Sequence, residues 1–198
     1  MMRSIALAVA TLLAGCAREP DLSPAPPLDE AAVIAASLPI AQAFQAELQG
    51  QLRAALAAGG PEAAIAVCQQ AAPAIAAAQS EASGARVSRV AERHRNPAGG
   101  VPEYLRAAYV RLAAKPLVDG KPNRLVVQTG SGSGAKVHFL AAIPMQDQPC
   151  STCHGTALDP ALKAQIERLY PGDLAFGFKP GELRGVLLIT WQAESFRK

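Results

Sequence analysis

A short segment in the last third of the chain has the residue types and spacing of a covalent cofactor site. Cys150 and Cys153 are separated by two residues, and His154 follows the second cysteine. Two thiols about one helical turn apart can bond to the two vinyl groups of a haem, and the adjacent histidine then becomes an axial ligand of the iron. The C-x-x-C-H pattern therefore predicts one covalently bound c-type haem.

Two other kinds of site also use paired cysteines. A zinc site would need two further ligands, and the chain has no second cysteine pair and no His-x₃₋₅-His run. A thioredoxin-like redox pair would open a helix in a βαβ pattern, which the residues after His154 do not show. We therefore expect haem rather than zinc or a redox dithiol.

The second axial position of the iron has several candidate ligands. Cys68 lies on the apolar face of an expected helix, where a cysteine is either a small buried hydrophobe or an axial thiolate. Met145 is so close in sequence to the first haem cysteine that a short loop would have to carry it round the ring. His138 lies in an expected strand and His94 lies among arginines. For these two, the alternatives to iron ligation are the ordinary roles of a packed and a solvated histidine. The residues by themselves leave the choice among these four side chains and an empty position open.

Four arginines are candidate partners for the two propionates of a haem. Arg89, Arg93 and Arg95 belong to one basic run, and Arg184 is the second residue of the last apolar segment. A guanidinium fork matches a carboxylate in both geometry and charge. A solvated strand edge is the alternative explanation of the basic run.

The N-terminus has the pattern of an export signal. A positive start, Met1–Arg3, precedes an apolar run over residues 5–13 that is too short to span a bilayer. Small residues come directly before Cys16, as in the sites that a lipoprotein signal peptidase cuts. We expect residues 1–15 to be removed, Cys16 to carry a lipid and residues 16–29 to form a proline-rich tether. The alternative is an ordinary secretory signal with an incidental cysteine.

The composition describes the domain, residues 30–198, that must position these side chains. Of the 198 residues, 50% are hydrophobic, only 5% are aromatic and 42 are alanine, which favours one domain of closely packed helices. Charged residues make up 18% and the net charge is +3, which argues against wholesale disorder and against a dedicated nucleic-acid-binding role. Beyond the N-terminal run, we expect no membrane-spanning segment. No nucleophile–base pair or paired-carboxylate motif indicates an enzyme.

Apolar spacing predicts helices in the first half of the domain and strands in the second. Large apolar residues recur every fourth position from Ile40 to Leu56 until Gly59-Gly60 ends the helix. An alanine-rich helix then packs back antiparallel to the first. Pro39 should start or kink the first helix, and Pro73 should kink or end the second. The remaining expected elements are helices over 102–114 and 159–170 and strands over 125–128, 137–143 and 183–191.

Several separated motifs follow one another in a characteristic order. They are Val67-Cys68, Ala72-Pro73-x-Ile75, Arg95-Asn96-Pro97-Ala98, Cys150-x-x-Cys153-His154-Gly155 and the tail from Tyr170 to Gly185. In this order they resemble a bacterial family of single-haem c-type domains with a PAS-like fold, over roughly residues 35–192. The resemblance implies an α+β fold, a PAS-like antiparallel sheet flanked by the N-terminal pair of long helices, with the haem between helix and sheet. It also implies His154 as one axial ligand and Cys68 as the second. Gly99-Gly100 departs from the pattern where an asparagine is expected.

Two roles fit an exported, lipid-anchored c-type haem protein. One is a redox or small-ligand (gas) sensor in which Cys68 leaves the iron; the alternative is a periplasmic electron-transfer cytochrome that keeps both ligands. Either role requires a redox or signalling protein as partner, because the chain shows no kinase or output module. We expect no enzymatic activity; a peroxidase-like protein would need an open iron position. Ala17 stands where an aspartate usually retains lipoproteins at the inner membrane, so we expect the periplasmic face of the outer membrane.

Overall fold

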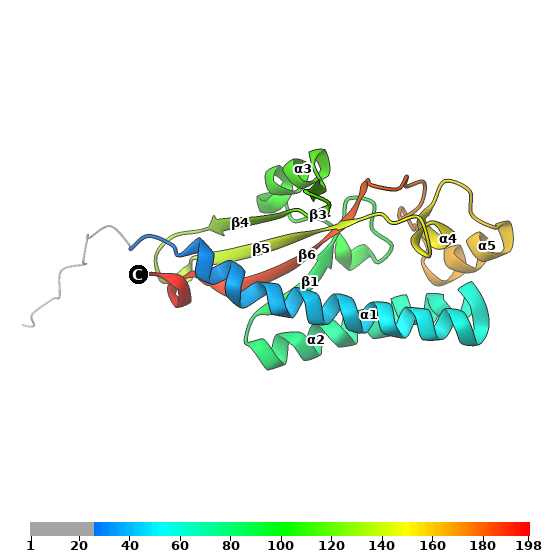
Figure 1. The fold of residues 1–198 in the computed structure, drawn as a ribbon, viewed down its shortest axis with the longest axis horizontal. Coiled ribbons are helices and arrows are strands. Elements are labelled where there is room, and N and C mark those ends of the chain that lie inside the picture. Colours follow the sequence, from blue (N-terminus) through cyan, green and yellow to red (C-terminus); the bar gives the residue numbers. More distant parts are fainter. Residues whose placement is uncertain (1–25) are drawn as a thin grey trace, which may run out of the picture.

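The computed structural model describes residues 26–198. The predicted signal peptide, Cys16 and most of the predicted tether lie outside these residues. A pair of antiparallel helices covers one face of an antiparallel sheet, and a shorter helix covers the other face (Figure 1). The predicted α+β class, with its antiparallel sheet and N-terminal helix pair, is confirmed. Its PAS-like character stays a prediction.

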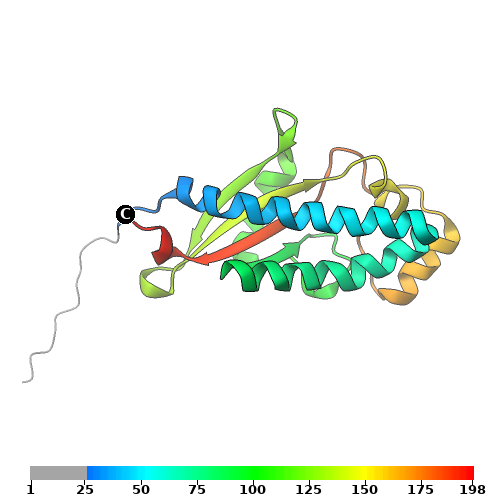
Figure 2. The ribbon, with the colours of Figure 1, turned by 60° about the horizontal axis from the view of Figure 1, so that its bottom comes forward.

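The helix pair is one helical run folded back on itself. Helix α1 (Glu30–Ala66) begins after Asp29, whose carboxylate accepts a hydrogen bond from a backbone N–H of the first turn. This cap places the start of α1 well before Pro39, so Pro39 does not start the helix, which was one of our two expectations for it. The helical dihedrals break at Gly59 and Gly60, and Gly60 has a φ of 67° that glycine adopts without strain. The chain reverses there, as predicted, and the two arms lie side by side (Figure 2).

Pro73 does not end the second arm, contrary to one of our two expectations. A π-helical turn (Val67–Ala71) precedes α2 (Ala72–Ser83), and the first N–H of α2 bonds to the first carbonyl of the π turn. Proline lacks an N–H, and its ring would clash with the carbonyl four residues earlier in an α-helix. The wider π turn gives that ring room, so the helix continues. Cys68 lies within the π turn.

The helical run from Glu30 to Ser83 passes a length and composition test for crossing a membrane. It has 54 residues, with a mean hydropathy of 1.3 in its most apolar window and 28% of that window buried. Core helices give similar values, and here the run bends back and packs its large apolar residues on the sheet. Within residues 26–198 no other helix passes the test. A single helix that passes is weak evidence against our expectation that the chain has no further membrane-spanning segment.

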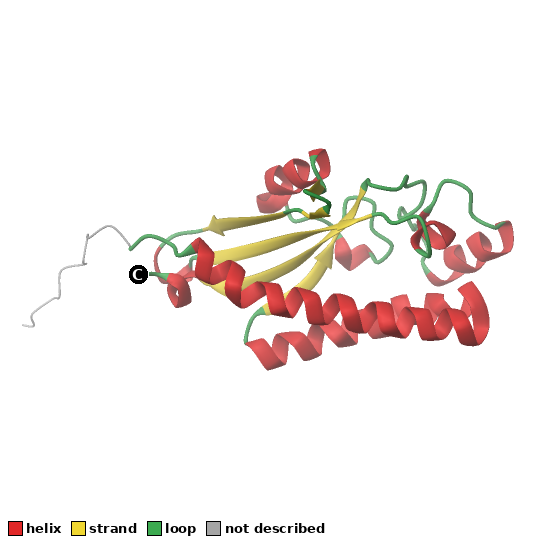
Figure 3. Cartoon of the chain, in the orientation of Figure 1, coloured by secondary structure: helices red, strands yellow, loops and turns green. Residues whose placement is uncertain are grey.

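Four antiparallel strands form the sheet, which is drawn in yellow in Figure 3. Their order is β1-β6-β5-β4. They are β1 (Arg86–Val90), β4 (Arg124–Thr129), β5 (Lys136–Pro144) and β6 (Leu183–Gln192). The short strands β2 (Leu117–Val118) and β3 (Lys121–Pro122) form a separate ribbon. The three strands expected from apolar spacing correspond to β4, β5 and β6. The basic run begins in β1, an edge strand, in keeping with the alternative explanation of its charge.

Both faces of the sheet are buried. On β6, Leu187 and Ile189 pack against the helix pair. Their neighbours Val186 and Leu188 point the other way and pack against the residues of α3 (Arg106–Ala114). Because both faces are covered, β6 has a continuous apolar sequence rather than an alternating one. This packing fixes the strands that carry two of the four predicted propionate arginines.

His138, one of the rival iron ligands, lies inside the sheet with the ordinary role of a packed histidine. Its side chain is 2% exposed on β5. Its two ring nitrogens are hydrogen-bonded to hydroxyls on the neighbouring strands, Nε2 to Thr129 Oγ1 at 2.8 Å and Nδ1 to Thr190 Oγ1 at 2.9 Å. Both nitrogens are therefore engaged within the protein.

The burial of His138 should make the stability of the fold pH-dependent. Desolvation, and secondarily the charge of Lys136, lowers the pKa of His138. Below the ordinary histidine pKa of about 6.5, His138 is protonated in the unfolded chain but stays neutral in the folded chain. The free energy of unfolding should therefore fall as the pH drops below about 6.5. We expect the Tm of the wild type to fall more between about pH 7 and pH 5 than that of His138→Gln. Parallel Tm profiles for the two proteins would contradict this.

The two ends of the described chain meet at one end of the molecule. Besides a β-bridge, an ion pair joins them, with Lys198 Nζ 2.6 Å from Asp29 Oδ2. Figure 1 shows this end opposite to helices α4 (Cys150–His154) and α5 (Pro160–Leu169). The chain thus enters the described domain at the end away from the C-x-x-C-H segment.

Candidate functional site

The C-x-x-C-H segment forms helix α4, beside the turn of the helix pair. Helix α5 follows it, capped by Asp159, whose Oδ1 accepts hydrogen bonds from the Ala161 and Leu162 N–H groups. Leu162 and Ile166 of α5 pack against Ile65 of α1. The capped helix therefore holds α4 against the end of the helix pair.

Gly155 ends α4 in a position where a side chain does not fit. A Cβ added there would lie 2.5 Å from the Ser151 carbonyl oxygen, whereas one added at Gly50 on α1 would meet nothing within 4 Å. We expect Gly155→Ala to lower the free energy of unfolding by about 1–3 kcal/mol through this clash. Gly50→Ala should raise it by roughly 0.5–1 kcal/mol, because alanine favours the helix. Urea unfolding followed by circular dichroism measures both, and an unchanged stability of Gly155→Ala would refute the clash.

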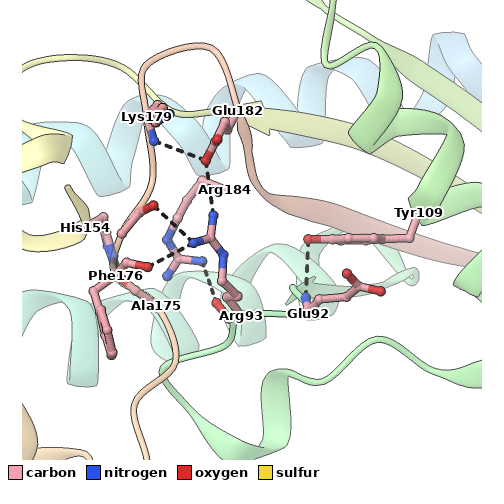
Figure 4. Close-up of polar contacts among 10 residues, drawn as sticks. Glu92, Arg93, Tyr109, His154, Ala175, Phe176, Lys179, Glu182 and Arg184 are labelled. Carbon is pink, nitrogen blue, oxygen red and sulfur yellow. Dashed lines mark hydrogen bonds and ion pairs between the residues drawn. The ribbon is translucent and has the colours of Figure 1, made fainter. Parts of the chain in front are cut away.

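His154 is oriented for binding a metal. Its Nδ1 donates a hydrogen bond of 2.6 Å to the Ala175 carbonyl oxygen (Figure 4). Desolvation, followed by the charges of Arg184 and Arg95, places the pKa of His154 well below its ordinary value, so the imidazole is neutral. With the proton on Nδ1, the lone pair of Nε2 remains for a ligand bond.

Arg95 joins the segments around His154. Its Nε is 3.1 Å from Asp173 Oδ2, and its Nη2 donates to the carbonyl oxygens of Cys153 at 2.8 Å and Ala175 at 3.4 Å. The two charged side chains are 7% and 3% exposed. Arg95 thus connects the basic run, α4 and the loop before β6, and its Nε and Nη2 donate to protein acceptors.

Arg93 is also engaged, at a more exposed position. Its Nη1 donates to the carbonyl oxygens of Phe176 and Gly177, and its Nη2 lies 3.2 Å from Glu182 Oε2 (Figure 4). Its guanidinium stacks on Phe178, 3.5 Å from the ring centroid. Arg93 therefore fastens the same loop from the solvent side.

Arg184 keeps hydrogen-bonding capacity that the described residues do not use. Its Nε is buried and has no hydrogen-bond partner within residues 26–198, while its Nη1 donates to the Arg93 carbonyl oxygen at 3.4 Å. Desolvation lowers the pKa of Arg184 to about 10, helped by the charges of Arg89 and Arg95. A buried donor without an acceptor costs about 1–3 kcal/mol, so this position favours an acceptor from outside the chain.

Arg89 is similarly unpaired. In the described part of the chain its side chain makes no hydrogen bond or ion pair, and its Cζ lies 5.8 Å from the Phe44 ring centroid. The side chain reaches solvent, yet desolvation is the main reason that its pKa is lowered, while Cys68 and Tyr170 act in the opposite direction. Arg89 is thus an exposed residue whose guanidinium has no partner among the described side chains.

Cys68 lies at the same end of the molecule as α4. It is a half-buried free thiol on the helix face that also carries Ile65 and Ile75. Ile65 packs in the cluster that includes Cys153 and Tyr170, whereas Ile75 packs in the core of the sheet. Cys68 is close enough to affect the pKa of Cys153, whose value is raised mainly by desolvation. The structure therefore places Cys68 between α5 and the sheet, near the predicted haem cysteines, which are also free thiols.

The other two rivals have different surroundings. Met145 is 3% exposed and packs with Ala175, Phe178 and Cys150, the residues that surround His154 or precede it. His94 donates from Nδ1 to the Glu92 carbonyl oxygen and lines a separate open pocket of about 350 Å³. No three His, Cys, Asp or Glu side chains of residues 26–198 gather as a metal site.

The loop between α5 and β6 was not among the sequence-predicted site residues. It supplies the Ala175 carbonyl that orients His154 and the Asp173 carboxylate that pairs with Arg95. A backbone carbonyl has no sequence signal of its own. The signal that could have pointed to this loop is its place in the tail motif from Tyr170 to Gly185.

Comparisons with known proteins agree with this picture. A family model described as Tll0287-like matches residues 26–191. The crystal structure of the cyanobacterial heme-protein Tll0287 is similar to this chain with a TM-score of 0.53 and 21% identity, covering 86% of this chain and 97% of that one. No curated protein sequence matches the chain. At this identity the structural likeness concerns the fold.

Proposed function

Because this chain belongs to the Tll0287-like family, we propose that it is a c-type haem protein with one haem bound covalently to Cys150 and Cys153. The structurally similar protein Tll0287 is itself described as a heme-protein. The observation that carries the proposal is the orientation of His154, whose Nδ1 is fixed by Ala175 and whose Nε2 is free beside two free thiols. This is the arrangement that an axial histidine of an attached haem requires.

The unpaired arginines fit the same group. A haem propionate would supply the acceptor that the buried Arg184 Nε lacks, and Arg89 offers a second free guanidinium. Arg93 and Arg95 already donate to protein oxygens, so in this proposal they hold the segments around His154 in place and do not bind the propionates. The bound haem would supply one-electron redox chemistry and an iron that binds ligands.

We assign the second axial position to Cys68. Its place between α5 and the sheet, near Cys153, supports this choice. Of its rivals, Met145 packs among residues that hold His154, and both nitrogens of His138 are hydrogen-bonded to threonines. A thiolate ligand would stabilise ferric iron and set a low reduction potential.

Redox or small-ligand sensing is the role that we favour. The observation behind it is the π-helical turn that carries Cys68. Such turns are rare insertions in α-helices and occur mostly at functional sites, and a change to α geometry would move the residues they carry. Release of Cys68 from the iron could thus be transmitted along the helix pair.

Electron transfer is the second candidate role. Large apolar side chains are exposed at Leu169, Leu174 and Phe176, on α5 and on the loop that holds His154. A small apolar surface beside a redox centre suits brief docking of a protein partner.

Export and lipid anchoring at Cys16 are part of the proposal. The first arm of α1, from Glu30 to the turn at Gly59, is about 43 Å long at 1.5 Å per residue. A lipid before Pro26 would therefore hold the protein by the end opposite to α4. In that orientation the haem would face the periplasm and a protein partner. Fractionation of wild type and Cys16→Ala tests the anchor, because only the wild type should remain with the outer membrane.

Covalent haem attachment is tested by coexpression with the haem-attachment machinery. Wild type and the control Ser151→Ala should show the mass of the chain plus one haem, with a c-type pyridine haemochrome spectrum. The double variant Cys150→Ala/Cys153→Ala should show neither. A wild type without covalent haem refutes the proposed function. Spectra of the reduced protein with carbon monoxide then separate the roles, because binding indicates a replaceable ligand and therefore sensing.

A further inference from the structure

The Ala175 carbonyl oxygen accepts hydrogen bonds from two side chains at once. His154 donates to it from Nδ1 at 2.6 Å, and Arg95 donates to it from Nη2 at 3.4 Å. A carbonyl oxygen has two lone pairs, so the two bonds form together. The proposed axial histidine is thus linked, through one oxygen atom, to a guanidinium.

The Asp173 carboxylate contacts both Arg95 and Ala175. Its Oδ2 lies 3.1 Å from Arg95 Nε, and its Oδ1 accepts a hydrogen bond of 2.8 Å from the Ala175 N–H. The Arg95 and Asp173 side chains are 7% and 3% exposed. Water therefore screens the charges of this pair less than it would screen those of a surface pair.

The charge of Arg95 has two effects that act in the same direction. A cation that donates to a carbonyl oxygen draws electron density from it, so the oxygen becomes a weaker acceptor for His154 Nδ1–H. A weaker hydrogen bond at Nδ1 makes the imidazole a poorer electron donor at Nε2, the atom that would bind the iron. A nearby positive charge also favours ferrous over ferric iron directly. The negative charge of Asp173 opposes both effects.

We propose that Arg95 and Asp173 are positioning residues that set the electron donation of His154, and with it the reduction potential of the iron, through the Ala175 carbonyl. This inference rests on the proposed haem and adds the part of the chain that controls its potential. Arg95 weakens the donation and Asp173 restores it, so the loss of each residue shifts the potential in the opposite direction. A pair that only stabilised the fold would show no such opposition, because the loss of either partner would loosen the same contacts.

The test measures the reduction potential of the holoprotein by spectroelectrochemistry at about pH 8, where carboxyl groups are ionised. At a fixed applied potential, Asp173→Asn should raise the ferrous-to-ferric ratio about 3- to 10-fold, because Arg95 keeps its charge without a counter-charge. Arg95→Gln should lower the ratio by a similar factor. A tenfold change corresponds to 59 mV for one electron. The double variant Arg95→Gln/Asp173→Asn should return to within about threefold of wild type, which tests the opposition even where Arg95→Gln alone does not fold.

Proton NMR of the ferrous low-spin holoprotein follows the hydrogen bond itself. The resonance of His154 Nδ1–H moves downfield as its hydrogen bond strengthens, so Arg95→Gln should move it downfield and Asp173→Asn upfield. Arg93→Gln is the matched control, because Arg93 donates to the Phe176 and Gly177 carbonyl oxygens and its side chain is 42% exposed. This control should change the ferrous-to-ferric ratio less than about twofold and leave the resonance in place.

Each outcome bears on the proposal separately from the haem. Unchanged potentials, or shifts in the same direction for Asp173→Asn and Arg95→Gln, would refute the tuning role. Opposite shifts with an unmoved Nδ1–H resonance would refute the route through Ala175. An equal shift for Arg93→Gln would show that any nearby charge has this effect, and so would also overturn the proposal. In all these cases the haem is present and the proposed function stands, whereas a wild type without haem refutes the proposed function instead.

Discussion

Arg95→Gln is expected to lower the free energy of unfolding by about 3–5 kcal/mol, the largest effect on stability among the charged residues of this site. The substitution removes the cation opposite Asp173, whose side chain is only 3% exposed. An uncompensated carboxylate would then be buried against the low-dielectric interior. The same change removes the donors to the Cys153 and Ala175 carbonyl oxygens, so three segments lose a common partner.

The exposed pair nearby provides the control for Arg95. Arg93 and Glu182 are also paired, at 3.2 Å, but their side chains are 42% and 44% exposed. Arg93→Gln should therefore cost less than about 1 kcal/mol. Urea unfolding of each variant measures the difference, and Arg95→Gln combined with Asp173→Asn should recover part of the loss. Equal costs for the two single variants would contradict the role assigned to the buried pair.

Local sequence signals predicted much of this fold. The four-residue spacing of apolar residues and the Gly59-Gly60 pair predicted the helix pair because helices and their ends depend mainly on neighbouring residues. The apolar runs of β5 and β6 identified strands because both faces of the sheet are covered.

Tertiary compensation limited the other fold predictions. Pro39 lies inside α1, and Pro73 is accommodated by a π turn instead of ending the helix. Proline in a helix interior costs roughly 3 kcal/mol, but packing of the helix against the sheet stabilises it by more than this. A rule based on neighbouring residues does not include that packing. The start of α1, by contrast, follows a local signal, the cap at Asp29.

The residues of the candidate site also fall into those that local sequence predicts and those that only the fold brings together. Cys150, Cys153 and His154 form a contiguous motif whose chemistry is readable from spacing alone. The partners of the arginines are not readable in this way, because Arg95 and Asp173 lie 78 residues apart and meet only through the fold. A basic run indicates that the segment can bind anions. Burial and geometry decide whether a carboxylate of the protein or one of a ligand pairs with each arginine. The buried, unpaired Nε of Arg184 became visible only in three dimensions.

Replacing Cys68 should change the reduction potential and the spectrum of the proposed haem more than any other substitution considered. Cys68→Met exchanges an anionic ligand for a neutral thioether, which favours ferrous over ferric iron. We expect the reduction potential to rise by a few tenths of a volt, within the range of about 0.8 V that axial ligands span. Cys68→Ala offers no ligand from this position and should shift the oxidised spectrum from low-spin towards high-spin bands. Spectroelectrochemical titration of the holoproteins measures both changes.

Met145→Leu separates ligation by Cys68 from a general disturbance of the site. The exchange nearly conserves volume at a buried position and should cost less than about 1.5 kcal/mol of stability. If Cys68 is the ligand, Met145→Leu leaves the spectrum and the potential unchanged, because Met145 packs among the residues around His154 and Cys150. If the Met145 variant shifts the spectrum and the Cys68 variants do not, the second ligand is Met145. The π turn would then hold only a packed cysteine, and sensing by its release would lose its structural basis.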